Sequence, residues 1–359
     1  VSTPADGDWY LRSSLTDPQP TPQPGEPQPE PTPQPTPAPS PLYQPGAPLY
    51  EGYGQTLQAL NQIATLQQRV GNRQWAQGTS ASRIESASGV WGRITGTQAR
   101  PDAAVSTSAA DLDIDSWKMQ LGADFALRQS DDGSALIGGL NGYYGKASAD
   151  VASLFGNGRI RTDGYGLGAT LTWYSTDGFY ADAQAQLSWF STDLRSDILG
   201  KLVDNNDGQG QAFSLELGKR IAVGGQLSLT PQLQTSYTHV AFDGFTDPYG
   251  AQVSLDKGSS LKTRLGLSLD HQAHSDSGSH HLYGVANLVY EWMDGTRVDV
   301  SGAALRHRDD RLWGEIGVGG SYSWNNRTTL YLQATGSTAM KDFGNSTALT
   351  GTAGLRVAF

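Results

Sequence analysis

The sequence predicts an all-β protein, a twelve-stranded antiparallel transmembrane β-barrel with an N-terminal α-helix in its lumen. Three observations lead to this fold class. Apolar and polar residues alternate with a period of two from position 88 to 359, which is the pattern of strands. Short and long connections alternate between these strands, as in outer-membrane barrels. An amide-rich segment with helical periodicity precedes the first strand.

Proline marks off the beginning of the chain, because fifteen of the 18 prolines lie in the first 48 residues. Residues 17–47 form an extended, semi-rigid stretch that buries nothing, and we interpret it as a linker. Residues 1–16 contain Asp-Trp-Tyr-Leu-Arg and are interpreted as the end of a strand-rich domain. We expect the chain to be either a mature protein or the C-terminal part of a longer precursor, since it shows no signal peptide.

A lumen helix is predicted over 48–75, because Tyr50, Tyr53 and Leu57 recur at three- and four-residue spacing. Gly71 follows as a C-terminal stop, and a cation near it favours the helix dipole. The opposite face is rich in amides, which suits a polar, partly hydrated tube better than an apolar core. The side chains that we expect to seat this helix are Gln58, Asn61, Gln62, Arg69, Asn72 and Arg73.

The barrel itself is predicted over 88–359. Its twelve period-2 segments are about 88–96, 112–129, 134–149, 160–175, 178–194, 209–222, 225–241, 259–273, 279–292, 311–324, 328–340 and 348–359. In 117–127 the odd positions are Trp, Met, Leu, Ala, Phe and Leu, and the even ones are polar or small. The facing of 134–149 stays open, because glycine occurs on both of its faces.

The connections separate two ends of the sheet. The links after even-numbered strands are tight, whereas those after odd-numbered strands reach the lengths of 242–258 and 293–310. Short periplasmic turns and longer external loops have this asymmetry, and a soluble sandwich has no reason for it. The stretch 298–307 reads either as a thirteenth strand or as part of a long external loop, and an even strand count favours the loop.

Charged residues on the polar face are predicted to point into the lumen, while the apolar face meets lipid. The interior charges that we expect to face the helix are Asp124, Asp182, Glu216, Arg264, Glu315 and Arg356. Tryptophans near strand ends would form the interfacial aromatic girdles. Twelve strands enclose more space than side chains fill unaided, so the helix is the expected occupant.

Composition excludes several functions. A net charge of −10 argues against a nucleic-acid partner, and the absence of cysteine removes thiol chemistry. The sequence contains no nucleophile elbow, phosphate loop or dinucleotide fingerprint, so we expect neither enzyme activity nor a cofactor. His271, His274, His280 and His281 surround a tight turn, but no carboxylate or sulfur completes a rigid ligand set. We therefore interpret them as an exposed polar turn and expect no metal site.

A series of motifs occurs in a fixed order along the chain: DWYLR (8–12), the proline linker, PLY (48–50), TLQQRVGNRQW (65–75), VWGRITG (90–96), LGAD (121–124), FSLELGKR (213–220), SLKTRLGL (260–267), WGEIGVG (313–319) and GLRVAF (354–359). By these motifs, nearly the whole chain resembles the C-terminal translocator domain of a type V secretion autotransporter. The resemblance implies an outer-membrane translocator that carries an upstream passenger to the cell surface of a Gram-negative bacterium and anchors it there. The alternative function is a diffusion porin with a displaceable helix plug, and a soluble adhesin is a third possibility.

The resemblance also implies partners: the chain's own passenger, the barrel-assembly machinery, and outer-membrane lipid and lipopolysaccharide around a monomeric barrel. The assembly machinery would read Leu355, Val357 and Phe359 as a terminal aromatic signal. Some members of the family cut an Asn–Asn bond in the helix beside lumen acids. This helix has Asn61–Gln62 instead, so we expect it to stay attached, with Asp124 and Glu216 paired to arginines.

Overall fold

The computed structural model describes residues 42–71, 88–275, 278–324, 327–341 and 343–359. The expected domain end at 1–16 and most of the expected linker lie outside the described residues, as do Asn72 and Arg73 of the expected helix seat.

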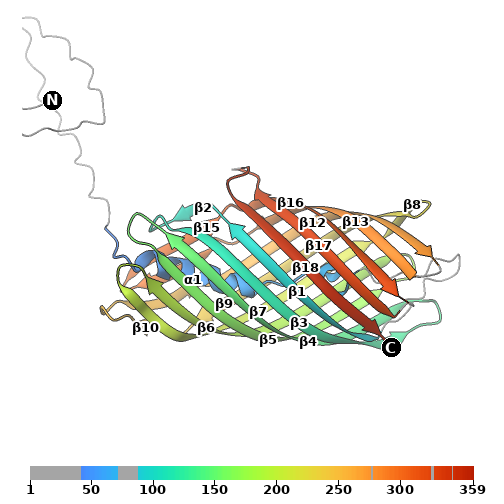
Figure 1. The fold of residues 1–359 in the computed structure, drawn as a ribbon, viewed down its shortest axis with the longest axis horizontal. Coiled ribbons are helices and arrows are strands. Elements are labelled where there is room, and N and C mark those ends of the chain that lie inside the picture. The colour runs from blue at the N-terminus through green and yellow to red at the C-terminus, as the bar shows by residue number, and fades with distance from the viewer. Residues whose placement is uncertain (1–41, 72–87, 276–277, 325–326, 342) are drawn as a thin grey trace, which may run out of the picture. The chain divides into compact units, whose positions relative to one another are not determined.

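Twelve strands close into an antiparallel barrel, which confirms the predicted fold class (Figure 1). They are β1 (Gly89–Arg100), β3 (Asp111–Gln129), β4 (Ala135–Ala152), β5 (Gly158–Tyr174), β6 (Phe179–Ser196), β7 (Gly200–Lys219), β9 (Leu227–Phe242), β12 (Ser259–Ser275), β13 (Gly278–Glu291), β16 (Leu312–Trp324), β17 (Thr328–Ala339) and β18 (Thr347–Ala358). The short strand β8 (Ile221–Gly224) follows β7 and also pairs with β9. Closure comes from β18 pairing with β1, where Val357 lies opposite Val90, so neither strand is left as a free edge.

Alternation along the strands separates a lipid face from a lumen face. Leu121, Leu167 and Ile316 are among the large apolar side chains that the outer surface exposes. The facing of β4 is also settled, because Leu140 is 66% exposed whereas Tyr143 is 5% exposed. Aromatic pairs form two bands on the outer surface. One band contains Trp117 with Tyr144 and Tyr165 with Trp189, near the middle of their long strands, and Tyr290 with Trp292 at the long-loop end of β13. The other contains Trp173 with Phe179 and Tyr322 with Trp324, at the short turns. This placement is that of interfacial girdles.

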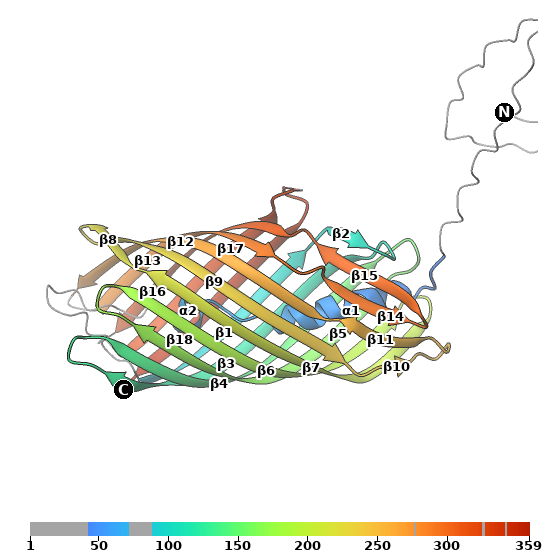
Figure 2. The ribbon, with the colours of Figure 1, turned by 180° about the vertical axis from the view of Figure 1, so that it is seen from behind.

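Three long connections build a second, five-stranded sheet beside the outer opening of the barrel (Figure 2). Its order is β10 (Phe245–Thr246), β11 (Gln252–Lys257), β14 (Thr296–Val300), β15 (Ala303–Asp309) and β2 (Ala103–Ser106). The stretch 298–307 is therefore a hairpin in this sheet and adds no strand to the barrel. Ser301 and Gly302 both have positive φ, at 52° and 89°, which suits the tight turn between β14 and β15.

The lumen segment differs from the single helix expected over 48–75. It forms α1 (Ala47–Leu60) and α2 (Leu66–Val70), with a non-helical connection between them. Thr65 starts α2 with a capping box, since its Oγ1 accepts from Gln68 N at 3.2 Å and its own N donates to Gln68 Oε1 at 3.1 Å. No described helix combines the length and apolar character that a membrane crossing requires.

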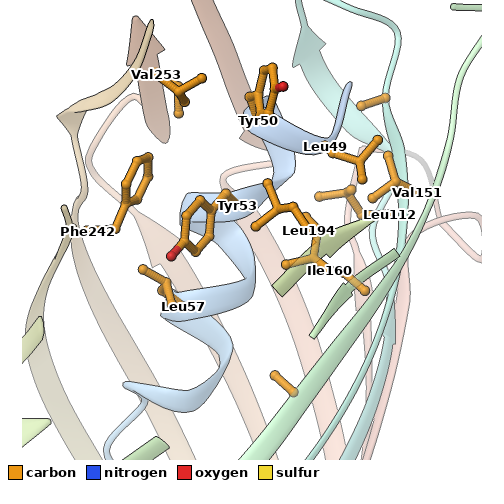
Figure 3. Packing of buried hydrophobic residues seen from close by; sticks show 14 of the residues in the cluster. Leu49, Tyr50, Tyr53, Leu57, Leu112, Val151, Ile160, Leu194, Phe242 and Val253 are labelled. Carbon is orange, nitrogen blue, oxygen red and sulfur yellow. The ribbon is translucent and has the colours of Figure 1, made fainter. Parts of the chain in front are cut away.

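The outer half of α1 lies in an apolar cluster rather than in a hydrated tube (Figure 3). Tyr53 stacks on Phe242 with ring centroids 4.1 Å apart, and Leu57 is fully buried. Close approach to the wall depends on small residues, because a Cβ on Gly52 would come within 2.8 Å of Leu112. Most of the charged side chains that contact the lumen segment gather around its lower part.

Candidate functional site

Arg69 of α2 lies at the centre of a buried ion cluster in the lumen. Its Nη2 is 2.6 Å from Asp182 Oδ1, and its Nη1 is 3.6 Å from Asp124 Oδ1. Its guanidinium also donates to the hydroxyls of Thr170 and Thr172 at 3.3 and 3.1 Å. All three charged side chains are at most 1% exposed, so the pairing offsets the desolvation that each charge suffers.

Glu216 of β7 forms a second buried cluster at the start of α2. Its Oε2 accepts from the backbone N of Leu66 at 3.1 Å, an N–H without a partner inside the helix. Its Oε1 accepts from Tyr180 OH at 2.7 Å. Arg264 reaches the same carboxylate, with Nη2 3.3 Å from Oε2. Glu216 therefore links the helix to three strands of the wall.

Side chains of the wall also bind the backbone of the lumen segment. Four carbonyl oxygens accept in this way: Gln62 from Lys118 Nζ (2.9 Å), Ala64 from Gln184 Nε2 (2.9 Å), Gln68 from Arg93 Nη1 (2.9 Å) and Arg69 from Tyr331 OH (2.8 Å). These bonds satisfy carbonyls that lack a helical partner at the break and at the end of α2. The wall thus compensates for the interruption of the helix.

Asn61, at the end of α1, is fully buried and its side chain is held on both sides. Its Nδ2 donates to the carbonyls of Gln211 and His239 at 3.0 and 3.1 Å. Its Oδ1 accepts from Ser188 Oγ at 3.0 Å. The amide of Asn61 is therefore fixed against three strands.

Gln58 and Gln62 are anchored differently. Gln58 Nε2 donates to Gly258 O at 2.6 Å, and its Oε1 accepts from Thr238 at 2.7 Å, so this amide contacts the wall. Gln62 Nε2 donates to Gln58 O at 3.0 Å within the lumen segment itself. Gln62 meets the wall through its backbone.

Only some of the interior charges predicted from the sequence contact the lumen segment. Asp124, Asp182 and Glu216 contact the lumen segment, and Arg264 reaches it through Glu216. Glu315 accepts from Asn287 Nδ2 at 2.6 Å and lines a cavity. Arg356 is buried at 6% exposure.

Sequence reasoning missed a second anchor at the outer end of α1, which we call the outer clasp: Glu51, Ser106, Ser108 and His307. Glu51 is 1% exposed, and its Oε2 accepts from Ser108 N and Oγ, both at 2.8 Å. Its Oε1 accepts from Ser106 Oγ and lies 3.4 Å from His307 Nδ1. Burial opposes the charge of His307, but hydrogen bonds to Asp309 and Glu51 outweigh it and raise its pKa to about 9. A lone acid among tyrosines and glycines was the only signal in the sequence.

A cavity of about 440 Å³ lies beside the lumen segment. Its wall includes Gln62, Lys118, Lys262, Glu315 and Thr350, so it is bounded by the lumen segment and by β3, β12, β16 and β18. The lumen segment therefore leaves one side of the lumen unfilled.

The histidine cluster differs in part from the expected exposed turn. His281 is 1% exposed, and its Nε2 lies 2.8 Å from Asp270 Oδ1. The rings of His271 and His280 stack with centroids 6.4 Å apart. Within the described ranges, no three His, Cys, Asp or Glu side chains gather in a way that could hold a metal ion.

A closed twelve-stranded barrel with a helix anchored in its lumen defines the class of outer-membrane translocator barrels. The chain belongs to the autotransporter β-domain family, whose model matches residues 90–335. It is 41% identical over 372 residues to the "Adhesin BmaC autotransporter" of Brucella suis biovar 1, which covers 99% of this chain and 10% of that protein. It is 27% identical over 255 residues to the "Pertactin autotransporter" of Bordetella bronchiseptica, covering 68% of this chain and 26% of the relative. The chain thus spans between a tenth and about a quarter of the length of these relatives.

Solved structures show the same fold. The transport unit of the autotransporter AIDA-I from Escherichia coli aligns with a TM-score of 0.72 and 19% identity, over 88% of this chain and 100% of that one. The translocator domain of NalP from Neisseria meningitidis aligns with a TM-score of 0.58 and 12% identity, over 76% and 89%. At these identities the likeness concerns the fold alone.

Proposed function

We propose that this barrel carries an upstream passenger to the cell surface and then anchors it, with the lumen segment left in place as plug and tether. The path of the chain supports the proposal. The chain enters α1 beside the long loops, where Tyr43 packs on Phe155, and α1 and α2 then run down the lumen (Figure 2). Strand β1 starts at the opposite end, where Gly89 lies beside Ala358. Such a path lets residues before the helix lie outside the cell.

Protease shaving of intact cells tests the route. An epitope tag placed before Val1 should be removed by external protease, whereas a tag inserted at 131–133, in a short turn, should survive. Both tagged chains share the same barrel, so they control for expression and membrane integrity. Protection of the tag before Val1 in a correctly assembled barrel would refute the proposed route.

We further propose that the lumen segment is not cut after export and that no catalytic step takes place in these residues. Cleavage after an asparagine by its own side chain needs the amide nitrogen to attack the backbone carbonyl. The Nδ2 of Asn61 is instead engaged by the carbonyls of Gln211 and His239. Gel electrophoresis of a chain tagged before Val1 should show the tag and barrel in one band, and a fragment beginning at Gln62 would contradict this.

A diffusion pore is the second candidate, and the cavity beside the lumen segment is the observation that favours it. The buried ion pairs of Arg69 and Glu216 speak against free displacement of the plug. Planar-bilayer recordings separate the two functions. The translocator predicts small currents with the lumen segment and large ones after deletion of 49–75, whereas large currents from the complete chain would favour the pore.

The partners follow from this role. We propose the barrel-assembly machinery as the partner during insertion and outer-leaflet lipopolysaccharide as the lasting neighbour of the mature barrel. Leu355, Val357 and Phe359 suit the first role, because they project from the last strand with 46%, 39% and 71% exposure. The passenger's own activity lies upstream of these residues, and the name of the Brucella relative makes an adhesin the first candidate.

A further inference from the structure

The five-stranded sheet beside the outer opening has one apolar face and one polar face. Leu255 lies opposite Val298, and Val298 lies opposite Leu305, so these three side chains form a row on one face. Val298 is fully buried and Leu305 is 1% exposed, and both belong to the apolar cluster that includes α1. On the other face, Ser254 and Ala304 are exposed. The sheet therefore turns its apolar face toward α1.

The outer clasp joins two of the three loops that build this sheet to α1. Ser108 lies in the loop 101–110, and His307 lies in the loop 292–311. Ser108 Oγ donates to Glu51 Oε2 at 2.8 Å, and His307 Nδ1 lies 3.4 Å from Glu51 Oε1. All three residues are at most 1% exposed. Loss of the Glu51 carboxylate would therefore take a buried hydrogen-bond partner from each loop, which is costly.

The third loop, 243–258, meets α1 at two levels. The ring of Phe245 packs edge-to-face on the ring of Tyr50, with centroids 5.9 Å apart. One turn and more further along the helix, Gln58 Nε2 donates to Gly258 O at 2.6 Å. All three loops are thus bound to the same helix, although they are far apart in the sequence.

Gly54 lets the helix approach the sheet closely. A Cβ at this position would lie 3.0 Å from Cγ2 of Thr296 and 3.4 Å from Cδ1 of Leu255. Thr296 belongs to β14 and Leu255 to β11, so α1 contacts two strands of the sheet at this point (Figure 2). A large side chain at position 54 would push the sheet away from the helix.

Backbone pairing gives this sheet little stability of its own. Its edge strands β2 and β10 have only four and two residues. Small sheets in water need an apolar face packed against another element. Here α1 supplies that element, and it also supplies the carboxylate that the buried Ser108 and His307 require.

We propose that the five-stranded sheet is a lid that α1 holds closed, so that the outer opening closes when α1 reaches its seat. Another stretch of chain in the lumen would hold the lid only if it placed a carboxylate and a glycine three residues apart on a helix, as Glu51 and Gly54 are. The inference rests on the proposed function, because it assigns closure of the lid to the end of passenger export. A closed lid also prevents α1 from sliding outward, which secures the tether.

Hydrogen exchange of the purified full chain in detergent tests whether α1 holds the lid. In Glu51→Ala, β14 and β15 should exchange at least tenfold faster, because the lid opens more often once Ser108 and His307 lose their partner. The wall strands β4 and β5 are the internal reference and should keep their rates. Unchanged exchange in β14 and β15 would overturn the proposal.

A second variant opens the lid without removing a hydrogen bond. Gly54→Leu places a side chain between α1 and the strands β11 and β14, and it should accelerate exchange in both strands. Ala59→Leu is the matched control on the same helix. Ala59 borders the cavity, which has room for the added side chain, so the lid should exchange at the wild-type rate. Equal lid exchange in these two variants would overturn the proposal.

A disulfide between α1 and the lid tests when the lid closes in cells. The chain contains no cysteine, so Gly54→Cys/Thr296→Cys introduces a single pair. A Cβ at Gly54 would lie 3.1 Å from Thr296 Cβ, and a disulfide needs about 3.5–4.5 Å, so a small adjustment permits the bond.

The double variant carries a tag before Val1 and is sampled after a short pulse of synthesis. The disulfide should form only in chains whose tag external protease can remove. Disulfide formation in chains whose tag is still protected would overturn the proposed order. A tag that never reaches the surface would refute the translocator proposal, whereas the exchange measurements on the purified chain do not depend on export.

Discussion

Arg69 is the residue on which the anchoring of the plug depends most directly. Replacing it in Arg69→Met leaves Asp124 and Asp182 as buried acids without their cation. Removing one partner of a buried ion pair costs about 3–5 kcal/mol, so the barrel should lose its compact gel mobility at a lower temperature. The measurement is the midpoint of that transition on heating in detergent.

The control for this change neutralises the acids as well. Arg69→Met/Asp124→Asn/Asp182→Asn removes the uncompensated charges, and it should recover most of the lost stability. The prediction fails if Arg69→Met unfolds at the wild-type temperature, or if the triple variant is no more stable than the single one.

Alternation within β3, β6 and β7 was sufficient to predict that Asp124, Asp182 and Glu216 point into the lumen. The ion-pair partners of these acids could not be predicted, because Arg69 and Asp182 are separated by 113 positions along the chain. Helical periodicity says which side chains share a face, but it does not say how that face is rotated inside the barrel. Such rotation is fixed by the wall, through contacts that include Tyr331 and Arg93.

His307 makes the outer clasp sensitive to pH. The folded-state pKa of His307 is about 9, above the ordinary value of 6.5. The protonated imidazole therefore contributes its full stabilisation of the outer clasp below pH 6.5. That contribution is lost as the pH rises through 9. Hydrogen exchange of the first turns of α1 should therefore accelerate between pH 6.5 and 9 beyond the intrinsic pH effect. His307→Gln should abolish this excess, and an unchanged excess in His307→Gln would assign it to another group.

At the scale of elements, the lumen segment is broken into two helices, which the helical periodicity of its apolar residues did not predict. Apolar residues continue at helical spacing through 48–64, but Thr65-Leu-Gln-Gln68 is a capping box that starts a new helix. The sequence contains this signal, and the prediction of one continuous helix overlooked it. The anchoring of Asn61 to the wall could not be seen in the sequence, because it depends on strands β7 and β9.

Removing the cap tests whether it holds α2 in place. Thr65→Ala deletes the acceptor for Gln68 N and should cost about 1 kcal/mol, which appears as faster hydrogen exchange in α2. Thr65→Ser keeps the hydroxyl and should behave like the wild type. Equal exchange in the Ala and Ser variants would show that Glu216 and the wall hold α2 without the cap.

At the scale of the whole molecule, the lumen segment is held by two different kinds of contact, one in the outer half of the lumen and one in the inner half. The outer half is an apolar cluster around α1, covered on one side by the five-stranded sheet. The inner half consists of buried ion pairs around α2. Strand count and parity predicted the barrel, but the second sheet arises from three separate loops, and no local pattern could bring those loops together.

Assembly of the barrel depends on β18, which joins the end of the chain to β1. Leu355, Val357 and Phe359 alternate on its outward face, and we expect Phe359 to act as a recognition element during insertion. Deletion of Phe359 should reduce the amount of protein in the outer membrane while synthesis stays unchanged, as measured by fractionation and by the heat-dependent gel shift. Phe343→Ala is the control. Phe343 is 77% exposed in a loop, and the substitution also removes one aromatic ring. Full assembly of the Phe359 deletion would show that this residue is an interfacial aromatic and no assembly signal. The deletion keeps the β1–β18 ladder from Ala358 to Thr347 and loses one backbone bond of the seam, from Phe359 N to Ser88 O.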